Sequence, residues 1–307
     1  MSAGKSIAVL EALFVTLLWS TSWVLIKVGL QRIPALSFAG LRYVLAFMAL
    51  AAFAALAGKL APLRRLTRGQ LARLALYGVI FFAVTQGSQF LGLYYLPAAS
   101  VSVLLNFTPL VVALAGIPLL GERPCGLQWL GIGVFLSGVG LFFLPFPLKG
   151  LNLPGAVVMI VGLAANSFST LYGRKINREA FADPLTVTLV SMGVGSALLL
   201  GAGTAVQGLP PLTGTDWLIV LWLAVVNTAL AFTLWNRALR RLEASEAGMI
   251  NCSMLAQITL MAWVFLGEPL TGRQWVAVFV VSAGVALSQL KNGRRRGSVT
   301  PPPAASA

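Results

Sequence analysis

Apolar segments of about 20 residues recur along the whole chain, separated by short stretches that carry polar residues, proline or glycine. Each segment is long enough to cross a hydrocarbon layer of about 30 Å as a helix. The pattern therefore predicts an all-α integral membrane protein with ten transmembrane helices, at residues 7–30, 34–57, 70–93, 97–120, 126–144, 153–173, 184–206, 215–237, 243–266 and 272–290.

One stretch of the chain occurs twice, 146 residues apart. Its matched positions are Leu96, Ala98, Gly121, Glu122, Gln128, Trp129 and Gly138, which correspond to Leu242, Ala244, Gly267, Glu268, Gln274, Trp275 and Gly284. A separation near half the chain length indicates two copies of one unit, and in a membrane protein this is typical of transporters with a site between the copies. We predict five-helix repeats at 1–148 and 149–292, followed by a disordered tail at 293–307.

The composition agrees with a membrane protein and removes several kinds of chemistry. Hydrophobic residues make up 58% of the chain and charged residues only 10%, which is too little charge to coat a soluble globule. The chain has no histidine, the commonest acid–base group and metal ligand. Its two cysteines, one in a short turn and one in an apolar segment, suit small buried or interfacial residues better than a disulfide framework. We expect neither a metal nor a cofactor.

The net charge of +14 is concentrated in particular loops. Most Lys and Arg residues lie at the N-terminus, in alternate loops and in the tail, so both termini are predicted to be cytoplasmic by the positive-inside rule. With five spans in each half, the turn at Gly121 then faces the cytoplasm and its copy at Gly267 faces outward. The two repeats are therefore predicted to be inverted, and the basic charge is explained without a nucleic-acid partner.

Several motifs resemble one family of transporters. They are WSTSWVLIK in the first span, LRYVLA in the second, LGLYYLPAASVSVLLNFTPLVVAL leading into the fourth, and the paired turns LLGERP and FLGEPL. Together they resemble the EamA-type exporters of the drug/metabolite transporter superfamily, and within these the bacterial aromatic amino-acid exporters of the inner membrane. The resemblance implies a central cavity lined by the first four helices of each half, with the fifth and tenth outside, and alternating access.

Polar side chains near the middle of five of these lining helices are candidates for the cavity wall, because a polar group at mid-membrane needs a partner or water. They offer hydrogen bonds to a zwitterion, or alternatively join neighbouring helices. The residues proposed for the cavity on these helices are Phe82, Gln86, Gln89, Asn106, Asn166, Thr170, Asn227, Cys252 and Thr259.

The first span adds an aromatic stripe to this list. Trp19, Trp23 and Lys27 repeat at helical spacing, with Ser20 beside them. Trp19 lies too deep for an interfacial belt, so it forms either an aromatic cavity wall or ordinary packing. Lys27 near the outer end either snorkels to the interface or holds a substrate carboxylate.

Arg42 lies about two turns into the second span, where its permanent charge is costly. It is a candidate for holding a substrate carboxylate; alternatively it binds helix carbonyls or Glu268 across an outer gate. The corresponding position in the second half lies near Met192, so the role of Arg42 is not duplicated.

A second group of residues is assigned to structure or gating. Glu122 and Glu268 follow glycine just before the fifth and tenth spans, where a carboxylate at a helix N-terminus is favourable. Pro109 predicts a kink in the fourth span, and its counterpart is Leu255. Gly121 and Gly267 form the turns themselves.

The prediction is a monomeric inner-membrane exporter of aromatic and other neutral amino acids and related metabolites. The identification of the substrate as an amino acid comes from the resemblance, whereas the residues alone indicate a cavity of mixed polarity. The alternatives are a carrier of phosphorylated or nucleotide-linked sugars, a drug efflux protein of the same fold, or an intramembrane enzyme. An enzyme would need catalytic groups, and the chain has no His and no paired intramembrane carboxylates, so we predict that the protein is not an enzyme.

Only Glu11 offers a titratable group for proton coupling, so transport is predicted to be facilitated or weakly coupled.

Overall fold

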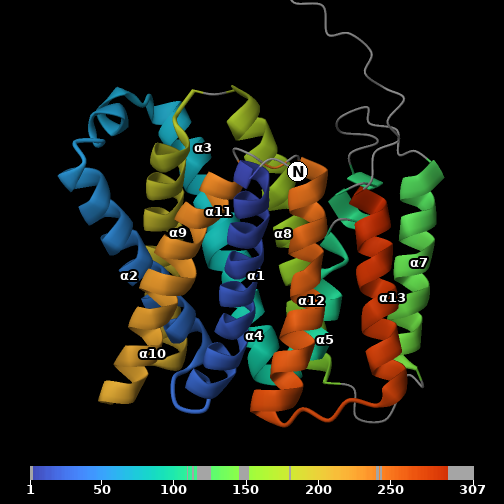
Figure 1. Ribbon diagram of the computed structural model, residues 1–307. Helices are drawn as coiled ribbons and strands as arrows, with labels where there is room; N and C mark the ends of the chain where they lie inside the picture. Colours follow the sequence, from blue (N-terminus) through green and yellow to red (C-terminus); the bar gives the residue numbers. More distant parts are fainter. Residues whose placement is uncertain are drawn as a thin grey trace, which may run out of the picture.

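The computed structural model describes residues 3–108, 110–112, 114–115, 126–144, 152–179, 181–239, 242 and 244–289, and all regular structure in these ranges is helical (Figure 1). The first half contains α1 (Ala3–Gly29), α2 (Ala35–Leu56), η1 (Ala61–Arg65), α3 (Arg68–Gly78), η2 (Val79–Thr85), α4 (Gln86–Tyr95), α5 (Ala98–Leu105) and α7 (Gly126–Phe143). The second half contains α8 (Leu153–Glu179), α9 (Pro184–Gln207), α10 (Gly214–Ala224), η3 (Val225–Leu230), α11 (Ala231–Leu239), α12 (Ala244–Leu266) and α13 (Gly272–Gln289).

Six of the described helices are long and apolar enough to cross a membrane by length and composition: Ser6–Gly29, Ala35–Leu56, Arg68–Tyr95, Gly126–Phe143, Leu153–Gly173 and Pro184–Gln207. Shorter apolar helices cover Ala98–Val112, Gly214–Leu230, Ser253–Leu266 and Gly272–Leu287. Large apolar side chains such as Leu10, Leu218 and Phe265 are at least 66% exposed, as expected for a surface in contact with lipid. The class of all-helical membrane protein is therefore confirmed.

The observed helices begin and end close to the predicted limits, with three differences. The helix predicted at 153–173 continues to Glu179. The fourth predicted segment is interrupted by a turn at Asn106 and Phe107, shortly before the proline at 109, which has no N–H to donate. The third and eighth predicted segments each contain a π-helical stretch, η2 and η3, that hydrophobicity does not reveal.

Two structural features recur at the 146-residue separation seen in the sequence. The helices α3 and α10 begin with capping boxes, Thr67 with Gln70 and Thr213 with Asp216. Both then run into a π-helical stretch, which begins at Val79 in one case and at Val225 in the other. The similarity between the halves therefore extends from residue types to local backbone geometry.

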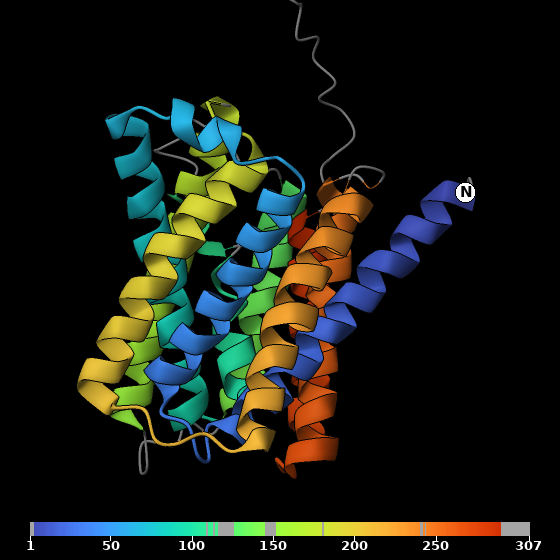
Figure 2. The same ribbon diagram turned by 90° about the vertical axis from the view of Figure 1, so that its left-hand side faces the viewer.

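The helices pack around four apolar clusters, of which two are large. The larger cluster involves α1, α2, α4 and α9, and the most extensive contacts within it are between α2 and α9. The second cluster joins α5, α12 and the pair α7–α13, which lies at one edge of the molecule (Figure 1). Seen from the left of that view, α1 leans away from the other helices towards the N-terminus (Figure 2).

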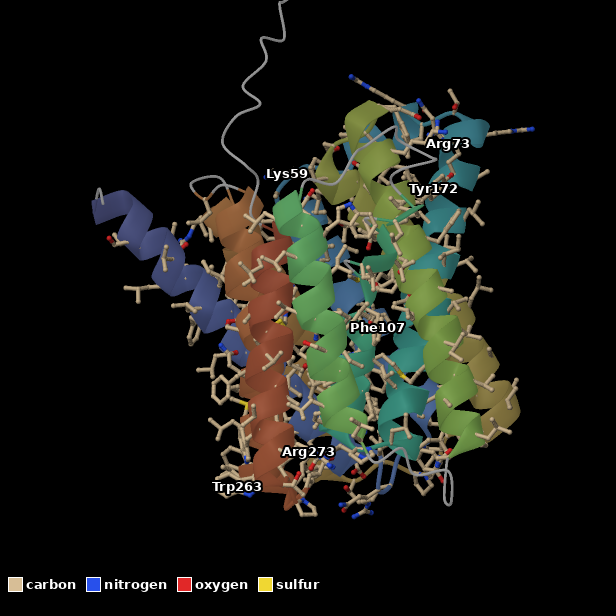
Figure 3. The ribbon with its side chains drawn as sticks, turned by 90° about the vertical axis from the view of Figure 1, so that its right-hand side faces the viewer. Lys59, Arg73, Phe107, Tyr172, Trp263 and Arg273 are labelled. Carbon is tan, nitrogen blue, oxygen red and sulfur yellow. The ribbon has the colours of Figure 1, made fainter. Side chains whose placement is uncertain are left out.

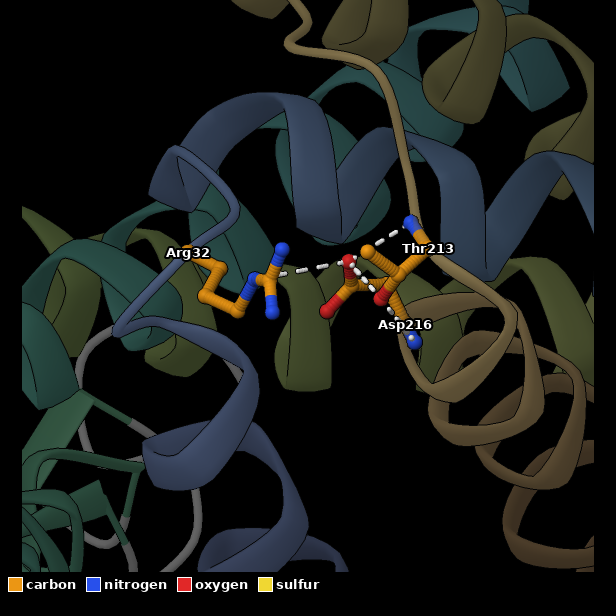
Figure 4. A network of polar contacts seen from close by, with 3 residues as sticks. All are labelled: Arg32, Thr213 and Asp216. Carbon is orange, nitrogen blue, oxygen red and sulfur yellow. Dashed lines mark hydrogen bonds and ion pairs between the residues drawn. The ribbon is translucent and has the colours of Figure 1, made fainter.

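Charged side chains lie at both ends of the molecule. Lys59 and Arg73 lie at one end and Arg273 at the other (Figure 3). At the first end, Arg73 forms an ion pair with Glu179 and thereby joins α3 to α8. At the second end, Asp216 accepts hydrogen bonds from Thr213 and lies 3.7 Å from Arg32 Nε (Figure 4).

Glycine brings α7 and α13 into close contact. A Cβ atom on Gly138 would lie 2.7 Å from the Val281 nitrogen, and one on Gly284 would lie 2.6 Å from the Phe135 Cα. Gly133 and Gly140 have no atom within 4 Å of such a Cβ, so these two glycines do not take part in the close contact. The helices approach each other through one equivalent glycine from each half.

We predict that Gly284→Val destabilises the protein, because its side chain would overlap main-chain atoms of α7 that cannot rotate away. Overpacking costs about 1–3 kcal/mol in ordinary cores, and a larger loss is expected here. The measurement is the thermal unfolding midpoint in detergent. Gly133→Val introduces the same residue into the partner helix at an open position and should leave the midpoint nearly unchanged; equal losses for the two variants would contradict the packing argument.

Candidate functional site

The candidate site is built around Arg42 and Tyr43 on α2. The Arg42 side chain is only 6% exposed, and its Nε donates to Thr228 Oγ1 at 3.3 Å. The guanidinium carbon lies 5.2 Å from the centre of the Tyr43 ring, a cation–π distance. The Tyr43 hydroxyl donates to Gln86 Oε1 at 2.7 Å. This network joins α2 to η3 and α4.

The two π-helical stretches converge on this pair. Thr228 of η3 contacts Arg42, and Phe82 of η2 packs its ring 5.5 Å from the Tyr43 ring. Positions 82 and 228 are equivalent in the two repeats. The site is therefore polar on the η3 side and aromatic on the η2 side.

The charge of Arg42 has no acidic partner among the described residues. The predicted alternative in which Arg42 reaches Glu268 is wrong, because Thr228 binds Arg42 and Glu268 binds the start of α5. The terminal guanidinium nitrogens make no hydrogen bond within the described ranges, although a buried cation is costly without a partner. The terminal nitrogens of Arg42 therefore keep hydrogen-bonding capacity that the described residues do not use.

Trp19 and Asn227 connect α1 to η3. The Trp19 indole nitrogen donates to the Asn227 main-chain oxygen at 3.1 Å, and its ring lies 5.2 Å from that of Trp235. The Asn227 amide donates to the Leu18 carbonyl and, at 3.2 Å, to Thr21 Oγ1. Asn227 Oδ1 is buried with no hydrogen-bond partner among the described residues. An acceptor is therefore unused next to the polar side of the site.

The other aromatic and hydroxyl groups of α1 face different neighbours. Trp23 is 6% exposed and lies in the larger apolar cluster, a position that favours packing over a cavity wall. Ser20 donates to Gln257 Oε1 at 3.0 Å, and Gln257 Nε2 donates to Thr16 Oγ1 at 3.2 Å. Gln257 was not among the predicted site residues, although an amide in the middle of an apolar segment was the signal that could have identified it.

The remaining predicted cavity residues divide between helix–helix contacts and local bonds. Asn166 Nδ2 donates to Thr108 Oγ1 at 2.9 Å, joining α8 to the fourth segment. Thr170 and Asn106 bond to carbonyls four residues earlier, and so does the fully buried Thr259. Gln89 is half-buried without a side-chain hydrogen bond in the described structure. The side chain of Cys252 lies outside the described residues, as do Pro109, Gly121 and Glu122.

Glu268 caps a helix of the other half at one end of the molecule. Helix α5 begins after Pro97, whose side chain cannot accept a hydrogen bond. The first amide groups of α5 donate instead to Glu268, at 2.8 Å from Ala98 and 3.4 Å from Ala99. Gly267 makes this turn with a φ of 62°, a conformation that favours glycine.

The expectation that Glu268 caps its own following helix is therefore wrong. Helix α13 is capped by Thr271 and Gln274, which exchange hydrogen bonds. Lys27 Nζ donates to the Leu96 carbonyl at 2.9 Å, directly before the capped helix, and Glu268 is the acidic group that acts on it electrostatically. Neither possibility considered for Lys27 included this main-chain contact.

A separate cleft of about 470 Å³ lies at the end that carries Arg32. It is lined by residues of the α1–α2 turn together with Tyr94, Tyr95 and Gln207. Nothing in the described part of the chain resembles a metal site, since no three His, Cys, Asp or Glu residues come together there.

An apolar, all-helical chain with amide, hydroxyl and guanidinium groups turned inward defines a multi-pass membrane protein with a polar interior. Both halves match the EamA-like transporter family, at residues 6–144 and 153–290. The chain belongs to the EamA-like transporter family. It is a transporter and not an enzyme, and the resemblance read from the sequence motifs is confirmed.

Two curated relatives align over most of the chain. The uncharacterized inner membrane transporter YedA of Escherichia coli K12 is 27% identical over 279 residues, which cover 89% of this chain and 88% of that protein. The probable amino-acid metabolite efflux pump of Salmonella typhimurium is 28% identical over 289 residues, or 90% and 93% of the two chains. A solved structure described only as "Crystal structure of protein" covers 92% of this chain and 97% of its own, with a TM-score of 0.66 at 20% identity, and supports the fold alone.

We predict that Glu268→Ala destabilises the protein, because the first N–H groups of α5 lose their acceptor and Pro97 cannot supply another. An unsatisfied buried donor costs about 1–3 kcal/mol. The measurement is again the thermal midpoint in detergent. Glu179→Ala removes a carboxylate from a partly exposed ion pair and should cause a much smaller loss; a Glu268→Ala midpoint as high as that of Glu179→Ala would contradict the capping role.

Proposed function

We propose that this protein exports aromatic and other neutral amino acids and related small metabolites, with Arg42 holding the substrate carboxylate. The observation that carries the proposal is Arg42, a residue only 6% exposed whose terminal guanidinium nitrogens make no hydrogen bond to the described residues. Arginine binds carboxylates in a two-pronged geometry that this arrangement leaves open. The printed name of one relative, a probable amino-acid metabolite efflux pump, supports the same class of substrate.

The surroundings of Arg42 fit a zwitterion with an apolar side chain. Asn227 Oδ1 offers an acceptor for an ammonium group, and Gln86 and Gln89 supply further amides. The packed rings of Tyr43 and Phe82 add aromatic groups beside the guanidinium. A phosphorylated or nucleotide-linked sugar would need several cations, whereas Arg42 and the half-buried Lys27 are the cations that the described lining helices place inward.

The architecture that we propose has ten spans in two inverted five-helix repeats, in a bacterial inner membrane, with both termini in the cytoplasm. The duplicated capping boxes and π-helical stretches support the repeat. The start of α1 and the end of α13 lie at the same end of the molecule (Figure 1), which is also the end of Lys59 and Arg73 (Figure 3). That end is the cytoplasmic one under the positive-inside rule. The protein acts as a monomer.

Alternating access then requires the outer end to open and close. The bonds from Ala98 and Ala99 to Glu268, together with Lys27 on the Leu96 carbonyl, hold the two halves together at that end. We assign Glu268 and Gly267 to the outer gate. Glu11 is paired with Arg237, so no free carboxylate serves as a proton carrier in the described part of α1, and transport is facilitated or weakly coupled.

We predict that Arg42→Gln raises the KM for phenylalanine at least tenfold in liposomes loaded for counterflow, because a charge-assisted pair to the carboxylate is lost. The measurement is the concentration dependence of labelled phenylalanine uptake. Arg32→Gln removes a cation that is 62% exposed at the molecular end and should leave the KM unchanged. Unaltered KM in Arg42→Gln, or exchange of nucleotide sugars in place of amino acids, would reject the proposal.

The inverted arrangement predicts opposite accessibility for equivalent loops. In a background with both cysteines replaced by alanine, Lys59→Cys should react with a membrane-impermeant maleimide only after the cells are opened. Leu209→Cys, at the equivalent turn of the second half, should react in intact cells. Labelling of both positions from the same side would indicate parallel repeats.

A further inference from the structure

Thr228 makes two hydrogen bonds that connect Arg42 to the backbone of η3. Its hydroxyl donates to the Leu223 carbonyl at 2.8 Å and accepts from Arg42 Nε at 3.3 Å. The Thr228 side chain is 1% exposed, so water does not replace either bond. The orientation of the Arg42 guanidinium therefore depends on a residue of the π-helical stretch.

The bond from Thr228 to Leu223 spans five residues, which is the hydrogen-bond spacing of a π-helix. Thr85 of η2 makes the same kind of bond, to the Ile80 carbonyl at 2.9 Å. By contrast, hydroxyls in the described α-helices bond to carbonyls three or four residues earlier, as those of Thr21, Thr170 and Thr259 do. The hydroxyl of Thr228 thus stabilises the wide turn in which it lies.

The π-helical turn of η3 also determines the direction in which the Thr228 side chain points. A π-helical turn contains one more residue than an α-helical turn, and each residue of an α-helix turns the chain by about 100°. Rewinding η3 to α-helix would rotate Thr228 relative to Leu223 by about that angle and remove the hydroxyl from Arg42. The geometry of η3 and the placement of Arg42 are therefore linked through one side chain.

We propose that Thr228 is the positioning residue that aims the two terminal nitrogens of Arg42 at a substrate carboxylate, by holding Nε in the π-helical form of η3. This inference rests on the proposed function of Arg42. It adds that the site is specific for a free carboxylate and that η3 determines this specificity through Thr228. The stretch η2 has the same hydroxyl bond but contacts no arginine, so it does not contribute to the specificity.

The experiment measures carboxylate preference as a ratio that is independent of the amount of active protein. In liposomes, the KM for labelled phenylalanine is compared with the inhibition constant of phenylalaninamide, which keeps the ring and ammonium group but lacks the carboxylate charge. Thr228→Val retains the branched shape without the hydroxyl and should lower the preference for phenylalanine about tenfold, the worth of one hydrogen bond to a charged group. Thr228→Ser should restore it.

Thr85→Val is the matched control, since it removes the equivalent five-residue bond without touching Arg42, and it should leave the ratio unchanged whatever it does to turnover. If Thr228→Val does not yield monodisperse protein, Thr228→Ala removes the same hydroxyl with less bulk. A normal ratio in the Thr228 variants, with the ratio lost in Arg42→Gln, would overturn the role of Thr228 and leave the proposed function intact. A wild-type protein that transports phenylalanine without preferring it to the amide would overturn both.

Discussion

The structure depends on one constraint, which is that hydrocarbon offers no hydrogen-bond partner to a buried polar group. Almost every polar side chain in the described interior has therefore found one, often a carbonyl of its own helix, as Thr16 and Ser20 have. Polar groups without a partner are therefore candidates for contact with a substrate. Arg42 keeps unused donors and Asn227 keeps an unused acceptor, and these two lie near η3, whereas the buried hydroxyls of Ser167 on α8 and Ser282 on α13 also have no partner among the described residues. The physical basis for the proposed site is that two groups with unused bonding capacity, one of them charged, lie in the same neighbourhood.

The same constraint explains how the two halves hold each other. A helix that begins after proline has no side-chain cap, and its first amide groups would be left unsatisfied. Glu268 supplies the acceptor from the other half, where Gly267 permits the turn that brings it there. The hydrogen bonds from the start of α5 to the Glu268 carboxylate are strong because they are charge-assisted and directional. They are nevertheless lost when α5 and the turn at Gly267 move apart. The contact between the halves at this point therefore depends on hydrogen bonds to one carboxylate.

The sequence was sufficient to predict the positions of the helices but not the polar contacts between them. Hydropathy locates apolar segments because it depends on residues close together in the chain, and the limits of α2 and α9 follow it closely. The partner of Glu268 lies 170 residues away in sequence, and the partner of Arg42 lies 186 away, so no local pattern indicates them. The π-helical stretches were missed because an extra residue in a turn leaves an apolar segment equally apolar.

Duplication followed by divergence accounts for the chemistry of the site. The equivalent positions 82 and 228 lie against adjacent residues of α2, yet one holds phenylalanine on Tyr43 and the other threonine on Arg42. Likewise, Asn227 corresponds to Phe81, whose ring packs against Phe82. Each half thus contributes the same backbone and a different side chain. Identical copies would have placed the same kind of side chain against both residues of α2, whereas the unequal copies place an aromatic ring against Tyr43 and a hydroxyl against Arg42.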